Sequence, residues 1–205
     1  MTEAELLAAG VAKMGLPVSV DMQEKLLKYL SLLQKWNKVY NLTAVRNPED
    51  MVVLHLLDSL SVLPYIRDKN ILDVGSGAGL PGVVLAIVKP DLQVTTIDTV
   101  QKKAIFMRQV KGELGLDNLT VINKRVEEFN SDELFEQVIS RAFSEVELFI
   151  RLTKHLIANN GQWLAMKGVA PIQELKALSL QPEKIIPLEV AFLEAERHLV
   201  IFENH

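Results

Sequence analysis

The chain has 205 residues, of which 49% are hydrophobic and 23% are charged, with a net charge of −4 and no cysteine. This composition is typical of a globular protein with a sizeable core, and it excludes a disulfide framework, a thiolate nucleophile and a cysteine metal site. The acidic balance argues against general affinity for nucleic acid, and no apolar run is long enough to span a bilayer, so we expect a cytoplasmic protein with no membrane partner.

The sequence pattern of residues 1–68 predicts a small helical N-terminal extension, which belongs to the same compact unit as residues 69–205. A possible capping box of Thr2 and Glu5 begins the first helix. The second helix begins near Val20. The third begins at Asn47, where a capping side chain is followed by proline and two acids, and it runs to about residue 63.

The segment 33–47 between the second and third helices contains three basic residues and no acidic one. Trp36 and Tyr40 are interleaved with these cations, a combination suited to phosphates and bases. Alternatively the two aromatic side chains belong to the core and the lysines are simply solvated. The three basic residues are Lys35, Lys38 and Arg46.

His55 and Asp58 interrupt the apolar run 52–63 of the third expected helix. Their spacing of three residues puts them on one helix face. We interpret them as a satisfied polar pair where the helical extension meets the next domain, and a catalytic role is the alternative.

From residue 69 to residue 205 strands and helices alternate, which predicts an α/β domain with a mostly parallel, seven-stranded sheet and helices on both faces. The expected strands are 71–74, 94–98, 119–123, 137–140, 162–167, 184–190 and 198–202. The expected helices are 82–89, 101–115, 146–158 and 171–180, with a turn at 126–129. The last two strands are joined without a helix, so we expect them to form an antiparallel hairpin.

The segment 73–82 places three alternating glycines between an expected strand and an expected helix, which is the opening of a nucleotide-binding βαβ unit. The third glycine is Gly79, whereas the dinucleotide fingerprint needs glycine where Leu80 stands. The pattern D-x-G-x-G-x-G is instead typical of methyltransferases that use S-adenosylmethionine (SAM). Val83 follows where a P-loop needs lysine, which disfavours that motif. A dinucleotide site and a turn without a ligand remain the alternatives.

The ends of the next strands supply further candidate residues, because open α/β sheets bind ligands at the carboxyl ends of their strands. Asp98 ends the second strand, where its carboxylate could accept hydrogen bonds from ribose hydroxyls, cap the helix 101–115, or do both. In the segment after the third strand, Val126 could pack on an adenine ring while Glu127 or the adjacent backbone reaches the exocyclic amine.

Cations gather at the same edge of the expected sheet. Arg141 ends the fourth strand, and a buried arginine without a function is costly, so we expect it to contact the SAM carboxylate or the substrate. Lys167 ends the fifth strand, and Arg125 follows the third. The Pro-Pro-aromatic run of amine methyltransferases is absent beside Arg141, which disfavours amine methylation. Four histidines without ligand spacing predict no metal site.

Together these segments resemble one family, the bacterial 16S rRNA guanine-N7 methyltransferases, also called glucose-inhibited division protein B. The likeness extends over essentially the whole chain. The segments that carry it are Lys35–Lys38, Tyr40–Thr43, His55 with Leu57–Ser59, Asp73–Gly82, Arg125–Phe129, Val138–Ala142 and Glu196–Val200.

The resemblance implies SAM-dependent methylation of N7 of guanine 527 in 16S rRNA, with that RNA as partner, free or within the 30S subunit or its precursor. We expect a monomer, although the sequence itself does not encode the oligomeric state. The residues expected to bind SAM are Gly75, Ser76, Gly77, Leu80, Asp98, Val126, Glu127 and Arg141. Those expected to bind RNA are Lys35, Lys38, Arg46, Phe143, Arg197 and His198. The expected catalytic residues are Arg141, Arg125 and Lys167.

The N7 atom of guanine has a free lone pair and no proton, so the expected reaction needs positioning and charge stabilisation but no general base. Three other functions stay open from the residues alone: an NAD-dependent oxidoreductase, a SAM-binding RNA protein without activity, and a small-molecule methyltransferase.

Overall fold

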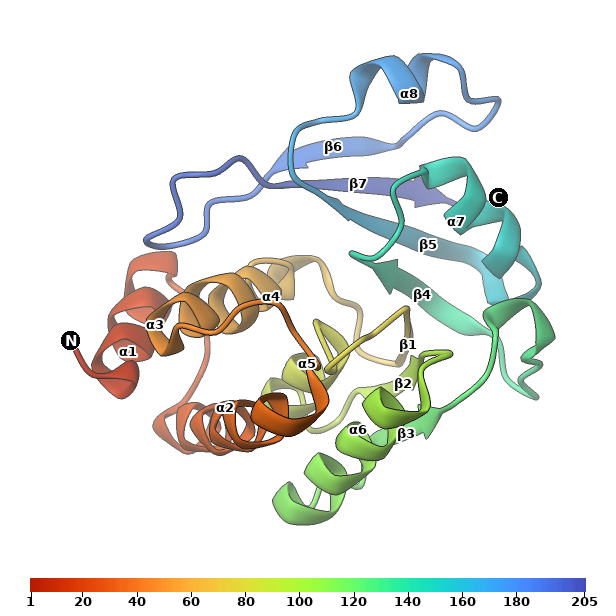
Figure 1. Ribbon diagram of the computed structural model, residues 1–205. Coiled ribbons are helices and arrows are strands. Elements are labelled where there is room, and N and C mark those ends of the chain that lie inside the picture. Colours follow the sequence, from red (N-terminus) through yellow and green to blue (C-terminus); the bar gives the residue numbers. More distant parts are fainter.

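A seven-stranded sheet forms the centre of the molecule in the computed structural model, which describes residues 1–205 (Figure 1). The strand order is β3-β2-β1-β4-β5-β7-β6. The first five strands are parallel, and β7 pairs antiparallel with both β5 and β6. The strands are β1 (Asn70–Val74), β2 (Gln93–Ile97), β3 (Leu119–Ile122), β4 (Phe135–Ser140), β5 (Ile157–Lys167), β6 (Lys184–Pro187) and β7 (His198–Glu203). The predicted α/β class and the terminal antiparallel pair are confirmed.

Helices cover both faces of the sheet, as Figure 1 shows. The residues of β1 alternate between the two faces because successive side chains of a strand point in opposite directions. Ile71 packs into the larger core with α1, α2, α5 and α6, whereas Leu72 and Val74 pack into a second core with α7. The helices of this domain are α5 (Gly82–Val88), α6 (Gln101–Leu114), α7 (Val146–Thr153) and α8 (Ile172–Lys176), with short 3-10 turns at Val126–Glu128 and Lys154–Leu156.

The N-terminal segment is helical, as predicted, and it packs on the face of the sheet that carries α5. Thr2 and Glu5 form both hydrogen bonds of the capping box, and the Asn47 side chain accepts from the Asp50 N–H. The elements are α1 (Glu3–Met14), α2 (Val20–Tyr40), α3 (Pro48–Met51), a π-helical turn (Val52–Leu57), α4 (Asp58–Leu60) and a 3-10 turn (Leu63–Tyr65). The third expected helix is therefore interrupted by a wider turn. No helix has the length and apolar character to cross a membrane.

Several boundaries differ from the prediction, in part because tertiary pairing overrides local sequence preference. The α8 helix ends at Lys176 rather than at residue 180, and β4 begins at Phe135 rather than at residue 137. The β5 strand begins at Ile157 rather than at residue 162, and α7 ends earlier than expected. Asn160 adopts a left-handed conformation, and its N–H donates to the Asn204 carbonyl, so the C-terminus extends the sheet there. The β6 strand ends at Pro187 rather than at residue 190, although the Leu188 N–H still donates to the Arg197 carbonyl at 2.8 Å.

Candidate functional site

The glycine loop follows β1 and approaches the end of β4 closely. Gly75 and Gly77 have φ angles of 68° and 59°, a conformation that side chains with a Cβ rarely adopt. A Cβ added to Gly75 would lie 2.8 Å from the Ala142 Cβ. The Gly77 N–H donates to Asp98 Oδ2 at 2.8 Å, which ties the loop to the end of β2.

The buried carboxylate of Asp73 anchors the glycine loop through hydrogen bonds. Its Oδ2 accepts hydrogen bonds from the Ser76 hydroxyl at 2.6 Å and from the Gly82 N–H at 2.8 Å, while its Oδ1 has no partner. Complete burial raises the pKa of Asp73 to about 7, although these hydrogen bonds and the charge of Arg141 oppose the shift. The Ser76 side chain is therefore engaged in holding the loop rather than in facing a ligand.

The helical N-terminal segment also holds the loop. Tyr29 on α2 is completely buried, and its hydroxyl donates to the Ala78 carbonyl at 2.7 Å. Leu80 is buried in the core below the loop. Sequence reasoning did not single out Tyr29, because its position among the leucines of α2 marks it only as a core residue.

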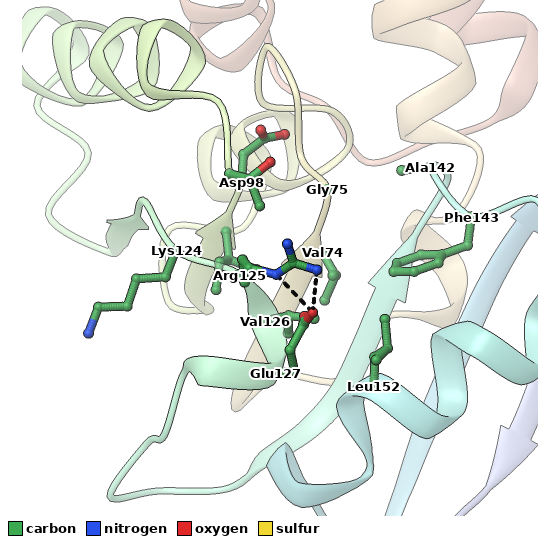
Figure 2. Close-up of a pocket in the computed structure, with 12 residues that line it drawn as sticks. Val74, Gly75, Asp98, Lys124, Arg125, Val126, Glu127, Ala142, Phe143 and Leu152 are labelled. Carbon is green, nitrogen blue, oxygen red and sulfur yellow. Dashed lines mark hydrogen bonds and ion pairs between the residues drawn. The ribbon is translucent and has the colours of Figure 1, made fainter.

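A cavity of about 360 Å³ lies beside the loop, at the carboxyl ends of β1, β2 and β3 (Figure 2). It brings together four of the eight residues expected to bind SAM, which are Gly75, Asp98, Val126 and Glu127. Arg125 and Phe143 also line it. Lys124, which precedes Arg125, and Ala142, from the segment 138–142 that carries the family resemblance, also line it. The sequence did not indicate two further lining residues, Thr99 and Leu152, because neither stands in a recognisable motif.

Asp98 lines this cavity, and its expected role as the cap of the helix at 101–115 is wrong. Its Oδ1 accepts from the Val100 N–H at 2.8 Å, but α6 begins after Val100 without any side-chain cap. Each carboxylate oxygen thus accepts one backbone N–H and keeps lone pairs for a further donor.

Arg125 lies on the side of the cavity opposite Phe143 (Figure 2). Its Nε and Nη2 donate to Glu127 Oε1 at 3.0 and 2.9 Å, and the Arg125 side chain is more exposed than that of Glu127. The Glu127 carboxylate is therefore paired with a cation, while Val126 is buried against the second core. Phe143 stacks at a tilt on Phe149, with 5.3 Å between ring centroids.

Arg141 lines a different cavity of about 240 Å³, at the ends of β4 and β5 and the beginning of β7. Its Nη1 donates to the Leu54 carbonyl at 3.1 Å and to Asp58 Oδ2 at 3.2 Å. Arg197 donates from Nε to Asp58 Oδ1 at 3.0 Å. The buried Asp58 carboxylate therefore holds two guanidinium groups. Lys167 and His198 line the same cavity.

Lys167 and His198 are both anchored to backbone carbonyls. Lys167 Nζ donates to the carbonyls of Phe143 and Ser144 at 2.9 and 2.7 Å, and His198 Nδ1 lies 2.7 Å from the Gly168 carbonyl. Of the three expected catalytic cations, Arg141 and Lys167 thus share one cavity, whereas Arg125 lines the other.

His55 lies at the seam between the helical segment and the sheet domain, as interpreted. Its Nε2 lies 2.8 Å from Thr43 Oγ1, and its Nδ1 lies 3.5 Å from Arg141 Nη2. Burial and the charge of Arg141 lower the pKa of His55 to about 4, so the ring is neutral at pH 7. His55 and Asp58 are each satisfied by partners on other segments rather than by one another.

The other residues expected to bind RNA lie on and after α2, outside the linings of both cavities. Lys35 and Lys38 are exposed, and Arg46 Nη2 donates to Asn41 Oδ1 at 2.6 Å. Trp36 is half-buried against Phe106, with 5.6 Å between ring centroids, which makes it part of the core packing. The exposed fraction of Tyr40 is 46%, so the core alternative holds for only one of the two aromatic residues.

Known folds resemble this arrangement. A SAM-dependent methyltransferase from Aquifex aeolicus superposes with a TM-score of 0.59 at 18% identity, covering 86% of this chain and 98% of that one. A TehB-like SAM-dependent methyltransferase from Corynebacterium glutamicum gives a TM-score of 0.57 at 14% identity, covering 87% and 99% of the two chains. At these identities the likeness shows the methyltransferase fold alone.

Proteins found by sequence comparison share a much higher identity with this chain than these structures do. A model of the family described as rRNA small subunit methyltransferase G matches residues 22–200. A protein of Methylobacillus flagellatus named "Ribosomal RNA small subunit methyltransferase G" is 63% identical over 194 residues, which is 95% of both chains. The protein of that name from Pseudomonas putida strain GB-1 is 52% identical over 205 residues, covering 98% of this chain and 95% of its own. The chain therefore belongs to the rRNA small subunit methyltransferase G family, whose members are SAM-dependent methyltransferases.

Proposed function

We propose that the protein transfers the methyl group of SAM to N7 of guanine 527 in 16S rRNA, acting as a cytoplasmic monomer on the RNA or on the 30S particle that contains it. The observation that supports this most is the adjacency of two cavities at the carboxyl edge of the sheet. One lies beside the glycine loop and has an acidic side chain at the end of β2, and the other is lined by cations. A nucleoside cofactor fits the first, and a polyanionic substrate fits the second.

The residues of the first cavity fit a nucleoside cofactor. Gly75 lets the loop pass close to Ala142, where an added Cβ would lie 2.8 Å from the Ala142 Cβ. The Asp98 carboxylate can accept hydrogen bonds from the ribose hydroxyls, Val126 offers an apolar surface to the adenine, and Glu127 or the adjacent backbone can accept from the exocyclic amine. When bound, SAM supplies an electrophilic methyl group on a positively charged sulfur.

The protein's own residues then have to orient the guanine and stabilise charge, because N7 carries no proton that a base would remove. Phe143 borders the first cavity and can stack on the base. Arg141 is the cation best placed to contact either the cofactor carboxylate or the guanine, because Asp58 and the Leu54 carbonyl fix its guanidinium at the end of β4. Lys167 fixes the carbonyls of Phe143 and Ser144, and so positions the stacking residue.

We assign the remaining expected residues to the RNA. Residues 1–68 form a helical cap on the SAM-binding domain, residues 69–205, and Lys35, Lys38 and Arg46 attract the phosphate backbone from this cap. Arg125 faces the first cavity from its exposed side, where it can act on a base or a phosphate.

The proposal is tested by mapping the methylation of 16S rRNA in cells with and without this protein. Reduction and aniline cleavage at N7-methylguanine should break the RNA at position 527 only when the protein is present. Purified protein with SAM should restore the cleavage to RNA or 30S subunits from the deletion strain. Cleavage at 527 that persists in the deletion strain would refute the assignment of the nucleotide.

A further inference from the structure

We propose that the cavity built on Asp58, lined by Arg141, Lys167, Arg197 and His198, binds a phosphodiester group of the RNA next to the guanine that is methylated. The inference rests on the proposed function and specifies how the same site holds its substrate. The Asp58 site is distinct from the cavity beside the glycine loop, with which it shares no lining residue.

Charge is the first argument for an anionic occupant. Three cationic side chains line the cavity, and Asp58 is the single carboxylate among the lining residues. Asp58 is 5% exposed, and each of its oxygens already accepts from a guanidinium. The surplus positive charge is therefore local, in a protein whose net charge is −4. Such a site attracts a phosphate, because its local positive charge stands against the acidic balance of the whole chain.

Unused hydrogen-bond donors are the second argument. Arg197 donates from Nε to Asp58 and from Nη1 to the Glu196 carbonyl, which leaves Nη2 without a partner. The Arg141 Nε is likewise without a partner. Guanidinium groups bind phosphate through several parallel hydrogen bonds.

The composition of the lining favours a phosphate over the guanine base. Only two of the eight lining residues are apolar, namely Met166 and Leu188, and no phenylalanine, tyrosine or tryptophan is among them. A base needs a stacking surface, which in this protein is offered by Phe143 at the other cavity. The position at the ends of β4 and β5 places the phosphate on the side of Arg141 away from the glycine loop.

The test is the salt dependence of binding to 16S rRNA from the deletion strain, since each phosphate contact to a single strand contributes about −0.7 to the slope of log K against log salt. Arg197→Gln should weaken binding about tenfold and make the slope shallower by about 0.7. Arg197→Lys should keep the slope. Arg151→Gln is the control, because Arg151 is exposed on α7 and lines neither cavity, so it should leave affinity and slope unchanged.

A second pair of variants leaves the ion pairs of Asp58 unchanged. Leu188→Glu adds a carboxylate to the lining and should weaken RNA binding about tenfold relative to Leu188→Gln, while calorimetry shows unchanged SAM affinity in both. The phosphate inference is overturned if Arg197→Gln keeps the wild-type slope, or if Leu188→Glu and Leu188→Gln bind RNA equally. Wild-type protein that methylates no 16S rRNA would instead refute the proposed function.

Discussion

The hydroxyl of Tyr29 connects the helical cap to the glycine loop, and its removal in Tyr29→Phe is the most direct test of that connection. The hydroxyl lies 2.7 Å from the Ala78 carbonyl, both residues are buried, and the ring itself would stay in place. Phenylalanine leaves a buried carbonyl without its donor, which costs about 1–3 kcal/mol. For a chain of this length, 2 kcal/mol corresponds to a fall in Tm of about 4–8 °C.

The measurement is denaturant unfolding monitored by fluorescence, together with SAM titration by calorimetry. Because the Ala78 carbonyl belongs to the loop, the variant should also lose SAM affinity. Tyr65→Phe is the matched control, since Tyr65 takes part in hydrogen bonding through its backbone carbonyl, which accepts from Gln137, and its hydroxyl has no partner. The control should change stability by less than about 0.5 kcal/mol. A Tyr29→Phe variant as stable as the control would refute the reasoning.

Three further substitutions test the glycine loop and the neighbouring end of β4. Gly75→Ala forces a Cβ into a left-handed backbone and to 2.8 Å from the Ala142 Cβ, so calorimetry should show SAM affinity at least about tenfold weaker. Asp73 keeps its proton in the folded state up to about pH 7 but loses it near pH 4 when unfolded, so its contribution to stability falls as pH rises through that window. Denaturation should therefore show the stability of wild type relative to Asp73→Asn declining by about 3 kcal/mol from pH 5 to pH 8, and a constant difference would contradict the raised pKa. Arg141→Ala should abolish methyl transfer in a tritiated-methyl assay with Tm near wild type, because Asp58 keeps Arg197 as partner, and wild-type turnover would remove the role given to Arg141.

The fold was predictable where its signals are local. The short apolar run before the glycines indicated a buried strand, and the capping residues Thr2 and Asn47 indicated where two helices begin. The contact of Tyr29 with the glycine loop joins residues 49 positions apart, and no local pattern encodes it. The extension of β5 likewise depends on the distant C-terminus.

The site was predictable as a set of strand ends but not as two cavities. Arg125 follows β3 and Arg141 follows β4, so both were expected beside one guanine. In the sheet β3 and β4 are separated by β2 and β1, which places the two guanidinium groups on opposite sides of the glycine loop. Sequence order gives no direct measure of this distance, because neighbouring strands in the chain need not be neighbours in the sheet.

The π-helical turn explains how Arg141 is held. The Asp58 N–H donates to the carbonyls of His55 and Val53, the latter five residues back, and not to the Leu54 carbonyl four residues back, as in an α-helix. The Leu54 carbonyl instead accepts from Arg141 Nη1 at 3.1 Å, and the same turn presents the Asp58 carboxylate to that nitrogen.

The nearby His55 contributes less to this arrangement. Its ring is neutral at pH 7, and its contact with Arg141 Nη2 is long, at 3.5 Å. A carboxylate binds a guanidinium far more strongly than a neutral imidazole does at that distance. The orientation of Arg141 therefore depends on Asp58 and on the backbone geometry of the turn, in which the Asp58 N–H bypasses the Leu54 carbonyl and Arg141 donates to it.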